Sequence, residues 1–211
     1  MKNLRQEICG ASAANAKALV GLLHGFGATA MDILSLGHAW ADALPSVRFI
    51  ALEAPDAVLG IPHGFQWFAL HDMNKSRILS EIEQLTPALK GSIDDNLQKC
   101  DLGWENVVLC GFSQGGALAL TQGLQHLPCA GVLSYSGMLA LGTSPINTKP
   151  VCLVHGDADD VVDPLHFEEA QRFLKAKGVS FEAHLDKGAA HTITPFAVSK
   201  GAQFLKRTFE L

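Results

Sequence analysis

Short apolar runs rich in valine, leucine and isoleucine recur along the chain, each bounded by glycine, proline or a polar residue. Such continuous runs are typical of strands buried on both faces, as in a parallel sheet. They cover residues 18–23, 47–52, 106–111, 130–136 and 151–156. A further run, residues 179–185, alternates apolar and polar positions, which predicts a strand with one exposed face.

Apolar residues at helical spacing lie between these runs. Ile78, Ile82, Leu85 and the positions that follow predict an amphipathic helix over residues 77–100, which Pro87 is expected to kink or divide. Other helical patterns cover residues 31–44, 114–127, 165–178 and 194–209. Alternating strands and helices predict a single α/β domain over residues 1–211, with right-handed crossovers and a mostly parallel sheet.

Composition narrows the function classes. The chain of 211 residues has a net charge of −5, and its 16 lysines and arginines form no basic patch, so nucleic acid is not an expected partner. The N-terminus lacks the apolar stretch of a signal peptide, and residues 18–23 are too short to span a bilayer. We therefore expect a cytoplasmic protein without an integral membrane segment.

The cysteines predict neither disulfides nor a metal site. They are odd in number and lack metal-ligand spacing, which favours a reducing compartment. Their positions are Cys9, Cys100, Cys110, Cys129 and Cys152.

A serine flanked by glycines provides the first candidate chemistry. Gly111, Ser113 and Gly115 form a G-x-S-x-G pattern between a predicted strand and a predicted helix. At such a turn a nucleophilic serine takes a strained conformation that exposes its hydroxyl, and side chains at the glycine positions would collide with the neighbouring strand and helix. The alternative is an ordinary strand-to-helix turn in which Ser113 caps the helix.

A nucleophilic serine needs a base, which in the hydrolase order follows the acid. His166, His184 and His191 are the candidates. His184 lies on the alternating strand and His166 opens a helix, so both are explained by surface roles. His191 lies in a small-residue loop between the last strand and the last helix, where a base could reach Ser113, and is favoured.

The acid is expected in the loop after the strand at residues 151–156. Asp157, Asp159, Asp160 and Asp163 compete there, and spacing alone does not choose among them. An oxyanion hole would use the backbone N–H of Gln114 and a second N–H from residues 24–27.

A rival hypothesis is an NAD-dependent oxidoreductase. Gly25, Gly27 and Ala30 form a G-x-G-x-x-A pattern, with Phe26 between the glycines, and Glu53 ends the next strand as a ribose-binding acid would. Glu53 lies further along than the usual separation of about 20 residues. The hypothesis also leaves Ser113, the aspartates and His191 unexplained.

With these residues in place, the chain resembles the phospholipase/carboxylesterase family, which includes acyl-protein thioesterases. The resemblance extends from about Lys17 to the C-terminus, and GFSQGGALAL is its most specific motif. The motifs are LHGFG (23–27), EAP (53–55), QWF (66–68), GFSQGGALAL (111–120), HGDADDVV (155–162) and GAAH (188–191).

The resemblance implies an α/β-hydrolase fold with helices on both faces of the sheet, no large cap domain and no cofactor or metal. It assigns Ser113 as nucleophile, His191 as base and Asp159 as acid. The N–H groups of Phe26 and Gln114 match the family's oxyanion hole. The implied enzyme is a serine hydrolase of carboxylic esters or thioesters.

Substrate choice stays open at this stage. Residues 53–76 form a long aromatic segment of a kind that is usually functional, and Trp67 and Phe68 in it are expected to line an acyl pocket with Phe26, Met138 and Val162. The family often has an aspartate where this chain has Ala69. A small carboxylesterase acting on a small-molecule or lipid-like acyl ester is favoured, and a thioesterase or a lysophospholipase is the alternative.

Overall fold

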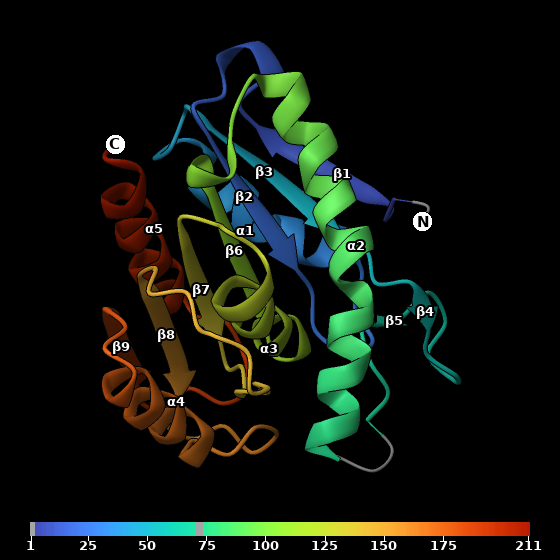
Figure 1. The fold of residues 1–211 in the computed structure, drawn as a ribbon, viewed down its shortest axis with the longest axis vertical. Coiled ribbons are helices and arrows are strands. Elements are labelled where there is room, and N and C mark those ends of the chain that lie inside the picture. Colours follow the sequence, from blue (N-terminus) through green and yellow to red (C-terminus); the bar gives the residue numbers. More distant parts are fainter. Residues whose placement is uncertain (1–2, 71–73) are drawn as a thin grey trace.

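The computed structural model describes residues 3–70 and 74–211, and a seven-stranded sheet organises them (Figure 1). The strand order is β1-β3-β2-β6-β7-β8-β9. β1 is antiparallel to β3, and every other pairing is parallel. The strands are β1 (Gln6–Gly10), β2 (Ala18–Leu23), β3 (Val47–Leu52), β6 (Val107–Phe112), β7 (Gly131–Tyr135), β8 (Val151–Gly156) and β9 (Phe181–Asp186).

The predicted strands agree closely with these bounds. β2, β6, β7 and β8 are buried at almost every position, as their continuous apolar runs predicted. β9 is half-buried because it forms an edge of the sheet and pairs only with β8. β1 was not predicted, since its sequence QEICG is mostly exposed and carries no apolar run.

Helices cover both faces of the sheet, as predicted. Figure 1 shows α2, α3 and α4 in front of the sheet and α1 and α5 behind it. The front helices share one apolar core with β2, β6 and β8, and the rear helices share a second core with the alternate residues of the same strands. The helices are α1 (Ala30–Ala41), α2 (Lys75–Cys100), α3 (Gln114–Thr121), α4 (Leu165–Ala176) and α5 (Pro195–Phe209).

Pro87 does not divide its helix, and another helix changes form before its predicted end. Pro87 lies inside α2, and the helix continues through it without being divided. The helix predicted over residues 114–127 changes at Thr121 into a π-helical turn, Gln122–His126. Within the described residues, no helix has both the length and the apolar character that crossing a bilayer requires.

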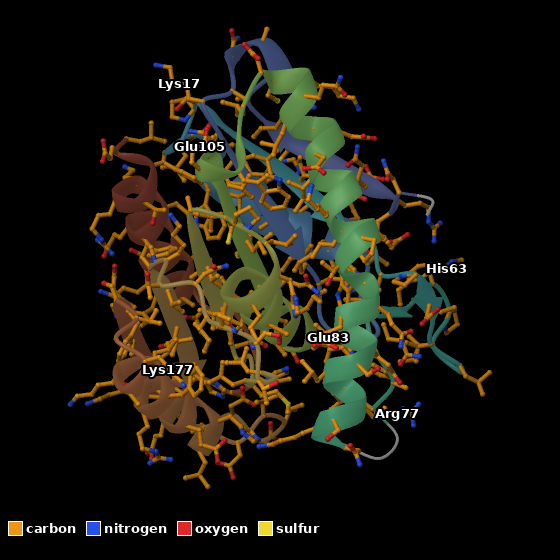
Figure 2. The ribbon with its side chains drawn as sticks, viewed as in Figure 1. Lys17, His63, Arg77, Glu83, Glu105 and Lys177 are labelled. Carbon is orange, nitrogen blue, oxygen red and sulfur yellow. The ribbon has the colours of Figure 1, made fainter. Side chains whose placement is uncertain are left out.

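The long aromatic segment contains a small hairpin outside the main sheet. β4 (Asp56–Ala57) pairs antiparallel with β5 (Phe65–Gln66). Figure 2 shows His63 on this hairpin, beyond α2. The Gly27 N–H donates to the Phe65 carbonyl at 2.8 Å, so the hairpin supports the loop that follows β2. Residues 71–73 of the segment lie outside the described residues.

Candidate active site

Three side chains predicted from separate parts of the sequence meet at the carboxyl end of the sheet. Ser113 follows β6, Asp159 follows β8, and His191 lies between β9 and α5. His191 Nδ1 is 2.8 Å from Asp159 Oδ2, and His191 Nε2 is 2.9 Å from Ser113 Oγ. The imidazole therefore connects the hydroxyl to the carboxylate through one hydrogen bond on each side.

The turn at Ser113 has a strained backbone. Its φ is 55° and its ψ is −115°, values that a residue with a side chain rarely adopts. A Cβ on Gly111 would overlap the Gly115 carbonyl, and one on Gly115 would overlap the Leu23 carbonyl. Both glycines are thus required by close backbone approach. Ser113 precedes α3, but its side chain makes no capping hydrogen bond, so the helix-cap alternative does not describe this serine.

Asp159 is buried and held as a carboxylate. One of its oxygens, Oδ1, accepts hydrogen bonds from the N–H groups of Val161 and Val162 at 3.0 and 2.9 Å. Burial alone would raise its pKa, but the hydrogen bonds from His191, from these two N–H groups and from the Ser136 side chain outweigh burial and lower the pKa below its ordinary value. An ionised carboxylate only accepts hydrogen bonds, so the proton of the neutral imidazole lies on His191 Nδ1.

Hydrogen bonds fasten the loop of Asp159 to the loop of His191. The Ala158 N–H donates to the Ala189 carbonyl at 3.0 Å, and the Asp157 N–H donates to the Asp186 carbonyl at 3.0 Å. Asp157 Oδ1 in turn accepts from the Gly188 N–H at 2.6 Å. Asp157 is therefore occupied in bracing the two loops and does not face the imidazole.

The other residues considered as the acid or the base have contacts elsewhere. Asp163 accepts from the Leu165 N–H at 2.9 Å at the start of α4, and Asp160 is exposed. His166 lies 3.1 Å from Glu169, and His184 lies 3.3 Å from Glu182. None of the four contacts Ser113 or His191 through a hydrogen bond between described residues.

Two backbone N–H groups are available beside Ser113. Gln114 is the first residue of α3, and the first N–H groups of a helix have no partner within it. The Phe26 N–H has no acceptor among the described residues. Gly25, directly before Phe26, packs against the turn, because a Cβ built on Gly25 would lie 3.5 Å from the Ser113 Cβ.

Two buried histidines support this end of the sheet and were missed by the sequence reasoning. His155 Nε2 lies 2.8 Å from the Val162 carbonyl and 3.4 Å from Asp159 Oδ2. His24 Nδ1 lies 2.7 Å from the Gly25 carbonyl, and His24 Nε2 accepts from the Ala54 N–H at 3.1 Å. A His-Gly pair at the end of an apolar run, present in LLHG (22–25) and LVHG (153–156), is the signal that could have found both.

We expect stability to fall as the pH drops below about 6.5, the ordinary pKa of histidine. Burial lowers the pKa of both His24 and His155. Between the unfolded and the folded pKa, these histidines are therefore protonated in the unfolded chain and neutral in the folded chain, which favours unfolding. The loss of unfolding free energy begins as the pH falls below the pKa of histidine in the unfolded chain, and it is complete below the pKa values of His24 and His155 in the folded chain. Urea unfolding at a series of pH values measures it.

His155→Gln should show a smaller decrease in unfolding free energy over this pH range than the wild type. His38→Gln, a change at an exposed position on α1, is the matched control and should follow the wild type. Parallel curves for the wild type and His155→Gln would contradict the assignment of this pH dependence to the buried histidine.

A cavity of about 340 Å³ opens beside Ser113, and we call it the Ser113 cavity. Four of the residues expected to bind substrate line it, namely Phe26, Phe68, Met138 and Val162. Its apolar wall also includes Ala28, Leu70, Phe112, Ala117 and Val161, which the sequence reasoning did not assign.

Trp67 does not line the Ser113 cavity, which corrects the expected pocket wall. Its side chain is buried, and its indole Nε1–H donates to the His24 carbonyl at 2.9 Å. The Gln114 side chain holds the same segment, because its Oε1 accepts from the Trp67 N–H at 2.8 Å and its Nε2 donates to the Phe68 carbonyl at 2.6 Å. Trp67 thus anchors the cavity wall from behind.

One group of metal-ligating side chains occurs among the described residues, away from Ser113. Cys152, Glu182 and His184 lie close together. Arg207 Nη2 pairs with Glu182 at 2.5 Å, and burial raises the pKa of Cys152 to about 12. A protonated thiol and a paired carboxylate make a poor donor set, so these residues do not fit a resident metal ion.

The N-terminus of α1 does not suit the pyrophosphate of a dinucleotide. Glu53 Oε2 accepts from the Ala30 N–H at 3.3 Å, and Asp32 forms a capping box with Thr29. Two carboxylates therefore lie where the oxidoreductase hypothesis needs a phosphate, and they would repel it. Arg5 pairs with Glu53 at 3.0 Å, which further occupies the proposed ribose-binding acid.

The parallel sheet, the strained serine at the end of β6 and the histidine beyond β9 define the class of protein, an α/β-hydrolase. Comparison with known proteins gives the particular family. A family model described as Phospholipase/Carboxylesterase matches residues 5–209, and the chain belongs to this family. The resemblance, the fold class and the enzyme class predicted from the sequence are confirmed.

Individual relatives agree with this assignment. The crystal structure of esterase PE8 is 33% identical, with a TM-score of 0.90 over 98% of this chain and 99% of that chain. "Acyl-protein thioesterase 1" of Mycosarcoma maydis is 27% identical over 90% of both chains. "Esterase YpfH" of Escherichia coli (strain K12) is 23% identical over 84% of this chain and 77% of that protein. The protein is a hydrolase that acts on esters.

Proposed function

We propose that this ester hydrolase works through a triad of Ser113, His191 and Asp159 and a covalent acyl-enzyme. The observation that carries the proposal is the pair of hydrogen bonds on the His191 imidazole, 2.9 Å to the Ser113 hydroxyl and 2.8 Å to the Asp159 carboxylate. With Nδ1 protonated, Nε2 has a free lone pair that can take the serine proton.

Acylation follows from this geometry. His191 Nε2 takes the proton of Ser113 Oγ as the oxygen attacks the ester carbonyl carbon. The carbonyl oxygen becomes an oxyanion, which the N–H groups of Phe26 and Gln114 stabilise; losing one such donor costs about 3 kcal/mol. The bond to the leaving oxygen or sulfur then breaks, and His191 gives that atom its proton.

Deacylation repeats the cycle with water. His191 removes a proton from water as the water oxygen attacks the acyl-enzyme, and then returns the proton to Ser113 Oγ as the acid departs. Asp159 stays ionised throughout and stabilises the imidazolium that forms in each half-reaction. No step of this cycle calls on a metal ion or a cofactor.

The Ser113 cavity supports a short or medium acyl chain. Its walls are mostly apolar, and its volume of about 340 Å³ lies near the lower end of the usual range for ligand pockets, about 300–1,000 Å³. This favours a small carboxylesterase acting on a small-molecule or lipid-like acyl ester. Thioester hydrolysis is the second candidate, because one relative is named an acyl-protein thioesterase.

We expect kcat/KM for p-nitrophenyl esters to rise modestly as the acyl chain lengthens from acetate. It should fall once the acyl chain is too long for the Ser113 cavity, at a length well short of palmitate. An apolar pocket discriminates by only about 1–3 kcal/mol per methylene, so the optimum should be broad. A rate series from acetate to palmitate, with an acyl thioester beside it, measures this. A maximum at palmitate, or a strong preference for the thioester, would favour the thioesterase.

A cytoplasmic location belongs to the same proposal. All five cysteines are free, and four of them are buried. Free thiols of this kind are typical of proteins that work in a reducing compartment.

A further inference from the structure

A second cavity adjoins the Ser113 cavity, and the His191 side chain lines both. The volume of this second cavity is about 500 Å³, and we call it the α1 cavity because residues of α1 form much of its wall. The two cavities share Gly25, Ala28, Phe112 and His191. Only the Ser113 cavity contains the serine, Gln114 and Met138.

The proposed reaction assigns a different part of the substrate to each cavity. During acylation the acyl carbon is bonded to Ser113 Oγ, and its oxygen points toward the N–H groups of Phe26 and Gln114, so the acyl chain belongs to the Ser113 cavity. The leaving oxygen must come within hydrogen-bond reach of His191 Nε2 to receive its proton. Because His191 also lines the α1 cavity, that cavity can receive the rest of the leaving group.

The wall of the α1 cavity combines apolar surface with one charge. Ile33, Leu36 and Ile193 are among its apolar residues, and Asp32 is the single charged side chain among the described residues that line it. Asp32 Oδ2 accepts from the Thr29 N–H and hydroxyl, each at 2.8 Å. Asp32 Oδ1 accepts no hydrogen bond from a described residue, so one carboxylate oxygen is available to a ligand.

The chemistry of this wall selects a cation. No lysine or arginine among the described residues lines the cavity, so no side chain of fixed positive charge in its wall pairs with Asp32. The Phe112 ring lies on the boundary with the Ser113 cavity, and aromatic rings also attract cations. An alcohol with an aliphatic stem and a positive group would place the stem on the apolar surface and the charge near Asp32.

We propose that the α1 cavity binds the leaving group of the ester and prefers an alcohol that carries a positive charge, such as a quaternary ammonium alcohol. This inference rests on the proposed function of Ser113, His191 and Asp159. Hydrolysis frees the alcohol when the bond between the acyl carbon and the ester oxygen breaks and His191 protonates that oxygen.

The test compares two acetates of the same shape. One is acetylcholine, and the other is 3,3-dimethylbutyl acetate, an uncharged analogue in which a carbon atom replaces the ammonium nitrogen. We expect wild-type kcat/KM to favour the choline ester by about fivefold to tenfold, the effect of one partly screened opposite charge. Asp32→Asn, which keeps an oxygen for the Thr29 cap, should bring the ratio close to one. Asp42→Asn, at the other end of α1 and exposed, is the matched control and should keep the wild-type ratio.

A second variant tests the space rather than the charge. Ser35 lines the α1 cavity from an exposed position on α1, and Ser35→Trp should fill it. We expect hydrolysis of both bulky acetates to fall at least fivefold more than hydrolysis of methyl acetate, whose leaving group needs little space.

The outcomes separate the two proposals. A wild type that hydrolyses methyl acetate but shows the same choline ratio as Asp32→Asn would overturn the cationic subsite alone. Unchanged hydrolysis of the bulky acetates in Ser35→Trp would overturn the placement of the leaving group. Failure of the wild type on every ester would overturn the proposed function and this inference with it.

Discussion

Ser113→Ala is expected to lower kcat for any ester substrate by about 10⁴- to 10⁶-fold, to the residual rate that binding and the oxyanion donors alone supply. The variant removes the oxygen that forms the acyl-enzyme in the proposed mechanism, and it leaves the hydrogen bond between His191 and Asp159 in place. A fluorophosphonate probe should label the wild type on the peptide that contains Ser113 and should not label the variant.

Fold damage is not expected to explain this loss. Alanine has the same Cβ as serine, so the strain at φ 55° is unchanged, and the melting temperature should stay close to that of the wild type. Ser199→Ala, at an exposed position on α5, is the matched control and should retain full activity and labelling. Turnover of Ser113→Ala within tenfold of the wild type would show that another group is the nucleophile.

Asp159→Asn is expected to lower kcat by about 10³- to 10⁴-fold while leaving the binding of substrate nearly unchanged. An asparagine amide can donate a hydrogen bond to His191 Nδ1, which would move the imidazole proton to Nε2. That nitrogen could then no longer accept the proton of Ser113. Steady-state kinetics should show the loss in kcat rather than in KM.

The same variant should change how stability depends on pH. The pKa of Asp159 is lower in the folded chain than its ordinary value of about 4, so this carboxylate stabilises the fold above that pH and the effect is lost as the pH falls through the folded pKa. Asp159→Asn should be less stable than the wild type at neutral pH, and the gap should narrow in acid. Asp160→Asn, an exposed change in the same loop, should show no such gap.

The sheet was predictable because most of its strands are buried on both faces. A strand such as β2, with all six residues buried, must be apolar throughout, and the continuous apolar run ALVGLL therefore predicts it. β1 was missed because an antiparallel edge strand needs only backbone partners, which QEICG provides through its pairing with β3. Pro87 did not divide α2, since packing of the helix on the sheet overrides the local preference.

The site was predictable where the chemistry restricts residue types and not where it depends on packing. Ser113 and its glycines follow from close backbone approach, whereas spacing left four aspartates open and the family motif chose Asp159. The prediction that Trp67 lines the pocket was wrong because an aromatic residue near a site can either line a cavity or support its wall. The hydrogen bond from the Trp67 indole N–H to the His24 carbonyl shows which role it has here, and the sequence does not reveal that partner. His155 and His24 were missed for a similar reason, since a buried histidine is recognised by its hydrogen bonds.

The loops of Asp159 and His191 and the wall formed by Phe68 and Leu70 are held by different sets of hydrogen bonds. Backbone hydrogen bonds such as that from Ala158 to Ala189 join the loops of Asp159 and His191, and these bonds do not depend on the surrounding side chains. Phe68 and Leu70, which line the Ser113 cavity, belong to a separate segment held by the Gln114 side chain. Mutational libraries confined to Phe68 and Leu70 should therefore change acyl selectivity while both hydrogen bonds of the His191 imidazole stay in place.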